Sequence, residues 1–147
     1  MASFYSTQMA LILGNTVPDK IKMQERGVMR VARWTYTTPA SGAPGTSDTL
    51  YVCRLPLGAI LLGGKTAAEA MSSAGGTAGY DIGYAGATNR YGNDIDIDAA
   101  GEDFFGNTIA LNYMDELTAE QDIIVTPTGE TWAVSSKFYG EFHYMLQ

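Results

Sequence analysis

The chain of 147 residues suits one domain with its own core, and its 46% hydrophobic and 17% charged composition excludes a disordered chain. Its formal net charge of −7 argues against a surface built to bind nucleic acid, because phosphate contacts need clustered Lys and Arg. Glycine and tyrosine, with 17 and 9 copies, favour strands and turns over long helices.

The first 27 residues are predicted to form an N-terminal arm, and residues 28–147 the folded domain. The apolar run at residues 9–13 is too short for a membrane span, which needs about 20 apolar residues, and no basic flank marks a signal peptide. Residues 19–26 could hold about two helical turns. We expect the arm to become ordered on a partner. Its proposed apolar anchors are Phe4, Tyr5, Met9, Leu11, Ile12 and Leu13.

Residues 28–38 alternate between apolar and polar side chains with the period of two that is typical of a half-buried strand. Ala32, Trp34 and Tyr36 share one face with Val28, and the opposite face carries Arg33, Thr35 and Thr37. A loop rich in Pro, Gly and Ser follows at residues 38–48. An apolar strand then begins at residue 49, and Pro56 and Gly58 interrupt it before a second short strand at residues 59–62.

Residues 59–66, AILLGGKT, match a relaxed phosphate-binding loop, in which Lys65 and Thr66 would hold a phosphate and a magnesium ion. Such a loop needs a buried parallel strand before it and a helix after it, with backbone N–H groups wrapped around the phosphates. Large apolar side chains at residues 60–62 occupy the wrapping positions, and Pro56 interrupts the strand that should precede them. We therefore interpret the motif as a core strand that ends at a glycine turn, residues 63–64.

Helical signals are few in the rest of the chain. Residues 65–73 contain good helix formers and favour a short helix, and residues 114–122 could hold one helical turn. Residues 78–84 alternate again, with Tyr80 and Ile82 predicted to face the core.

Asp94, Asp96 and Asp98 occupy every second position of the next segment. On a strand their carboxylates would share one face at a spacing of about 6.6 Å. The glycine and glutamate that an EF-hand loop needs are absent from the matching positions. We interpret the three side chains as a solvated face, with a weak calcium site as the alternative.

The C-terminal part reads as a strand, a turn at residues 127–129 and a last strand. Val134, Phe138, Phe142 and Tyr144 are predicted to share one face of that last strand. Many short strands between turn signals predict an all-β antiparallel sandwich or barrel. The predicted core includes Trp34, Tyr80, Ile82, Phe138 and Phe142.

No catalytic constellation is evident in the sequence. The single histidine, His143, and the single cysteine, Cys53, are too few for a metal site built from those residue types, and no nucleophile elbow occurs. We expect Cys53 to be a small buried residue and His143 a surface or packing residue. Trp34 and Trp132 could form a sugar-binding platform, although such residues more often lie in the core of a β-rich domain. No enzyme activity and no cofactor are predicted.

Four stretches together resemble the small β-sandwich structural proteins of tailed bacteriophages, which often serve as head decoration or cement proteins. They are residues 51–64, with Leu-Pro-x-Gly-Ala; residues 78–86, with a DIGYA-type strand; residues 93–106, with Asp-x-Asp and a following Phe; and residues 122–145, with an I-x-V-T-x-T-G hairpin before an aromatic strand. The resemblance covers roughly residues 28–145. The helix-prone residues 65–73 depart from it, because it implies a strand or an extended turn there.

The resemblance implies a jelly-roll-like antiparallel β-sandwich with an N-terminal arm, assembled as a homo-oligomer with a trimer favoured. It implies a non-enzymatic virion protein that binds the major capsid protein and stabilises the capsid. Such a protein would be made in the cytoplasm of the host bacterium and would lie on the capsid surface, with no nucleic-acid or membrane partner. The alternatives are a phage tail or fibre component and a glycan-binding β-sandwich module.

Overall fold

The computed structural model describes residues 29–46, 48–72, 76–106 and 116–146. This part of the chain contains no helix, and hence none that could cross a membrane. It contains eight strands: β1 (Met29–Thr37), β2 (Leu50–Leu55), β3 (Ala59–Ala68), β4 (Gly79–Tyr84), β5 (Ala87–Asp96), β6 (Gly101–Phe105), β7 (Gln121–Thr128) and β8 (Lys137–Leu146).

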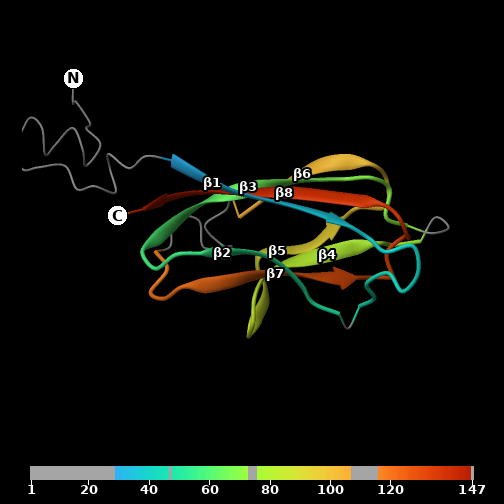
Figure 1. Ribbon diagram of the computed structural model, residues 1–147, viewed down its shortest axis with the longest axis horizontal. Coiled ribbons are helices and arrows are strands. Elements are labelled where there is room, and N and C mark those ends of the chain that lie inside the picture. The colour runs from blue at the N-terminus through green and yellow to red at the C-terminus, as the bar shows by residue number, and fades with distance from the viewer. Residues whose placement is uncertain (1–28, 47, 73–75, 107–115, 147) are drawn as a thin grey trace, which may run out of the picture.

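The strands form two four-stranded antiparallel sheets, ordered β1-β8-β3-β6 and β2-β7-β4-β5. Figure 1 shows these sheets as two facing layers, with the start of β1 beside the end of β8. Among the described strands, only β4 and β5 are joined as consecutive neighbours in one sheet, through a tight turn at Gly86, where φ is 95°. Each other connection crosses between the layers, which is the strand order of a jelly roll. The predicted jelly-roll-like sandwich is confirmed.

The alternation predicted for the first strand is confirmed in β1. Trp34 is buried, Ala32 and Tyr36 pack against the core, and Arg33 and Thr35 remain exposed. Because β1 pairs with β8 in an unbroken register, each inward residue of one strand lies beside an inward residue of the other.

Aromatic side chains fill the space between the sheets. Phe142 contacts the rings of Trp34, Tyr91 and Phe105, with centroid distances of 5.6, 5.6 and 4.8 Å. These tilted and edge-on contacts are the geometry that aromatic pairs prefer. The predicted core residues are all buried: Trp34, Tyr80, Ile82, Phe138 and Phe142.

The polar atoms of two of these core aromatics find partners inside the sandwich. The Tyr80 hydroxyl lies 2.5 Å from the Thr66 hydroxyl, and the indole N–H of Trp132 donates to the Gly79 carbonyl at 3.1 Å. Burial raises the pKa of Tyr80, so this side chain stays a neutral phenol. In a phosphate-binding loop Thr66 would bind a metal ion. Here its side chain is buried and hydrogen-bonded to Tyr80.

Two predictions for the AILLGGKT segment are wrong. β3 does not end at the glycines but continues to Ala68, with a bulge between Leu61 and Gly63, where φ is 104°. The short helix predicted for residues 65–73 is also absent from its described part, residues 65–72, because residues 65–68 pair with both β6 and β8. Ladder hydrogen bonds on two sides outweigh a weak helical propensity.

The C-terminal segment also differs from its prediction. Val134 lies before β8 with 51% of its surface exposed, so it does not share the face of Phe138. β7 includes Pro127 and Thr128, so the turn begins only at Gly129. β7 and β8 belong to different sheets, so their connection is a crossover rather than a hairpin.

The described part of residues 114–122 contains no helical turn. Glu116 forms an isolated bridge with Ile60, and β7 already begins at Gln121. The short helix predicted for residues 19–26 lies outside the described residues.

Candidate interaction surface

The outer face of the β1-β8-β3-β6 sheet carries the most conspicuous set of exposed side chains. The strand registers place Arg33, Glu141, Lys65 and Phe104 side by side across all four strands. This central row faces outward, because Trp34 and Phe142, its neighbours along β1 and β8, are buried.

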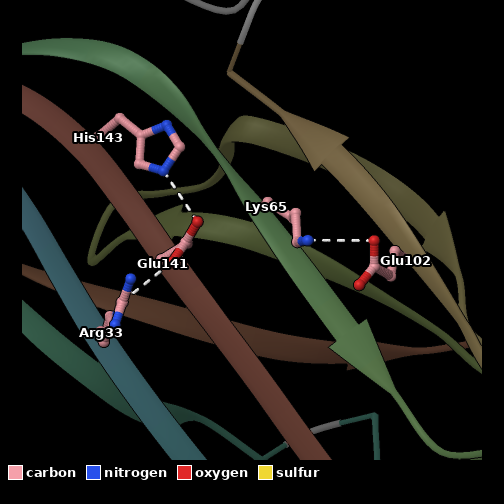
Figure 2. A network of polar contacts seen from close by, with 5 residues as sticks. All are labelled: Arg33, Lys65, Glu102, Glu141 and His143. Atoms are coloured by element: carbon pink, nitrogen blue, oxygen red, sulfur yellow. Dashed lines mark hydrogen bonds and ion pairs between the residues drawn. The ribbon is translucent and has the colours of Figure 1, made fainter.

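Ion pairs connect this row and the residues around it (Figure 2). The Arg33 Nε lies 3.1 Å from one Glu141 oxygen, and the His143 Nε2 lies 2.9 Å from the other. In the same view, Lys65 reaches Glu102 on β6, with Nζ and Oε2 3.1 Å apart. The two basic and two acidic side chains leave this part of the face close to neutral.

The contacts of Glu141 change its acidity. The hydrogen bond with His143, assisted by Arg33, lowers the pKa of the Glu141 carboxyl below its usual value, although partial burial acts in the opposite direction. Within the described residues, no Ser, Thr or Cys side chain is hydrogen-bonded to the His143–Glu141 pair. The pair is therefore a hydrogen-bonded surface contact without the neighbouring nucleophile that a catalytic base would serve.

Large apolar side chains surround the ion pairs on the same face. Met29 and Val31 on β1 are 58% and 40% exposed, and Phe104 on β6 is 68% exposed. Tyr139 on β8 borders a shallow hollow of about 180 Å³ beside the central row. These side chains lie on both edge strands and on β8 between them, and exposed Met and aromatic residues are enriched on surfaces that contact another protein.

The predicted calcium candidates lie in the last part of β5, in the other sheet, and in the loop that follows it. Asp94, Asp96 and Asp98 line one hollow, but β5 ends at Asp96 and Asp94 has a positive φ of 47°. Their carboxylates accept internal hydrogen bonds: Asp94 from the Thr128 hydroxyl at 2.6 Å, Asp96 from the Asp98 N–H at 2.8 Å, and Asp98 from the Ala78 N–H. Within the described residues, no group of three His, Cys, Asp or Glu side chains is arranged to hold a metal ion.

Other residues singled out from the sequence do not form a chemical site. Burial raises the pKa of Cys53 to about 12, so its thiol stays protonated and unreactive. Trp34 and Trp132 are buried in the core, which removes them from any sugar-binding platform. The six predicted partner-binding anchors lie outside the described residues: Phe4, Tyr5, Met9, Leu11, Ile12 and Leu13.

The exposed aromatic at residue 104 was missed by the sequence reasoning, although a signal was present. Phe104 and Phe105 are adjacent, and neighbouring side chains of a strand point to opposite faces. Because Phe105 is buried, Phe104 has to lie on the outer face.

Comparisons with known proteins identify the fold. No family model matches the sequence, and no curated protein does. A chain in the structure of the cyanophage Pam1 capsid asymmetric unit shares the fold with a TM-score of 0.67 and 18% identity, over 100% of both chains. A chain of the capsid of Ralstonia phage GP4 has a TM-score of 0.64 and 15% identity over 82% of this chain and 86% of that one.

A third similar chain belongs to the acidic stable capsid structure of Helicobacter pylori bacteriophage KHP30. It has a TM-score of 0.58 and 13% identity, over 81% of this chain and 88% of that one. At such identities the likeness shows a shared fold, here the fold of chains found in three phage capsids.

Proposed function

We propose that this chain is a non-enzymatic structural protein of a tailed-bacteriophage virion, which binds the major capsid protein and stabilises the capsid as a decoration or cement protein. The observation that carries the proposal is the shared fold with chains of three phage capsids, one of them matched over its whole length. The protein would lie on the outside of the capsid after its synthesis in the host cytoplasm.

The surface of the domain supports a role in contact rather than in chemistry. The outer face of the β1-β8-β3-β6 sheet combines exposed apolar side chains with ion pairs between neighbouring strands. A single face of this kind would give modest affinity. Many copies on a repeating lattice gain avidity from such contacts, provided that several can engage at once.

Residues 1–27 are proposed to be an arm that anchors the domain, residues 28–147, to a neighbouring subunit or to the shell. The apolar character of the arm supports this role. Covering its six large apolar side chains with a partner removes them from water, which lowers the free energy of the bound state. The domain is proposed to assemble as a homotrimer, since threefold positions recur on icosahedral shells.

The test is binding to purified capsids that lack this protein, followed by sedimentation and quantification of the bound chain. We expect the full-length protein to bind. A form lacking residues 2–26 should keep the β-sheet signal in circular dichroism but bind more weakly. Failure of the full-length, folded protein to bind any such capsid would contradict the decoration role.

A further inference from the structure

The two sheets expose four edge strands among the described residues: β1, β6, β2 and β5. An edge strand presents unpaired N–H and C=O groups, which another chain can use for pairing. Natural proteins block this with short strands, bulges, charges or proline. The four edges of this protein differ in how far they are blocked.

Three of the edges are interrupted or short. β2 has a bulge between Tyr51 and Cys53 and is followed directly by Pro56. β5 has two irregularities in its pairing with β4. β6 is only five residues long and carries the adjacent acids Glu102 and Asp103.

The remaining edge, β1, is long and regular. Its nine residues pair with β8 without a register shift, from Met29 opposite Met145 to Thr37 opposite Lys137. β1 contains neither Pro nor Gly, and within the described residues no strand pairs with its other side. Of its two charged side chains, Arg30 and Arg33, the second is paired with Glu141 on β8. Its outward side chains Met29 and Val31 are exposed at the end where the chain enters the domain.

The segment before β1 has the sequence of a strand. Residues 1–16 contain no charged residue, and residues 5–13 carry Tyr, Thr, Met, Leu and Leu at every second position. The intervening residues 14–28 can span roughly 50 Å when extended. A common hairpin loop has roughly two to five residues, and this stretch is far longer. Its length favours pairing with another molecule over a hairpin with β1 of the same chain.

We propose that residues 5–13 of one copy pair as an additional strand with the free edge of β1 in a second copy. Main-chain hydrogen bonds would complete the edge, and alternate apolar side chains would cover Met29 and Val31. Such an exchange is head-to-tail, so it closes into a ring when the rotation permits. The inference rests on the homo-oligomer in the proposed function and is independent of capsid binding.

The experiment measures the mass of the full-length protein by light scattering. The parent should have a multiple of the mass of one chain. Val31→Lys with Thr35→Lys charges two exposed positions of the β1 edge, and Met9→Lys with Leu11→Lys charges the proposed strand. Both double variants should fall to the mass of one chain. The matched control, Thr88→Lys on the exposed edge of β5, should keep the parent mass.

Mixing the two double variants identifies which copy supplies the strand. The Met9→Lys, Leu11→Lys variant retains an intact β1 edge, and the Val31→Lys, Thr35→Lys variant retains an intact N-terminal segment. The segment of the second can pair with the edge of the first, so the mixture should regain the mass of two chains. Thermal unfolding of each variant checks that the domain is folded. A parent with the mass of one chain, folded β1 variants that keep the parent mass, or a mixture without association would each overturn the proposal.

Discussion

The two faces of β8 differ in burial, although their residues alternate along one strand. Phe138 and Phe142 point inward and are fully buried among aromatic rings from both sheets. Glu141 and His143 point outward and are hydrogen-bonded to each other, and a quarter to a third of each side chain is exposed. The inner face therefore contributes most of the stability of β8, and the outer face is the one that other molecules can reach.

The largest expected effect is on the inner face. Phe142→Ala should lower the free energy of unfolding by about 3–5 kcal/mol, because three neighbouring rings would line the cavity that the substitution leaves. Urea denaturation followed by fluorescence measures this loss. An alanine variant as stable as the parent would contradict the burial of this face of β8.

A glycine on the inner face should be nearly as sensitive. The indole of Trp34 packs over Gly140, so the Cβ of Gly140→Ala would collide with the ring. We expect a loss of roughly 1–3 kcal/mol from this overpacking. The matched control is Gly101→Ala on β6 of the same sheet, where the nearest atom to a new Cβ is 4.0 Å away. Equal stabilities for the two variants would show that Trp34 can move aside.

A smaller, pH-dependent effect is expected on the outer face. The contacts with His143 and Arg33 hold the pKa of Glu141 below its usual value of 4.5, so the carboxylate form stabilises the fold. This contribution is present above pH 4.5 and is lost as the pH falls through the lowered pKa. Glu141→Gln should be less stable than the parent at pH 7, by less than about 1 kcal/mol.

Thermal unfolding across the pH range tests this linkage. The difference between the parent and Glu141→Gln should shrink to zero in strong acid, where the carboxyl is protonated in both folded and unfolded chains. A difference that stays constant down to pH 2 would mean that the pair with His143 does not act through ionisation.

The smallest effect is expected at Lys65, also on the outer face. Its ion pair with Glu102 is solvent-exposed, so Lys65→Ala should change the free energy of unfolding by no more than about 0.5 kcal/mol. Calorimetry of the parent with ATP checks the discarded phosphate-loop interpretation at the same position. Tight ATP binding that is lost in Lys65→Ala would restore that interpretation.

The same comparison explains what could be predicted from the sequence. Alternation within a strand is a local pattern, so the inward side chains Trp34, Tyr80 and Phe142 were identified without a structure. The full length of β3 was not identified. Its continuation beyond Gly63 depends on pairing with β6 and β8, which lie far along the chain. Helix formers at residues 65–68 consequently gave a wrong local signal.

The candidate surface was harder to foresee than the core. Arg33, Lys65 and Glu141 come from three strands, and only the registers of β1, β8 and β3 bring them into one row. Nothing in the local sequence fixes these registers. The crossover from β7 to β8 was missed for the same reason, since a turn signal does not reveal whether the next strand stays in the same sheet.

The most direct test of the proposed function is electron microscopy of phage capsids to which this protein has been added, compared with capsids that lack it. We expect additional density on the outer surface at regular, symmetry-related positions. The jelly-roll sandwich should fit each copy, and the orientation should show which sheet faces the shell. Capsids without added density, although the protein is folded and in excess, would contradict the decoration role.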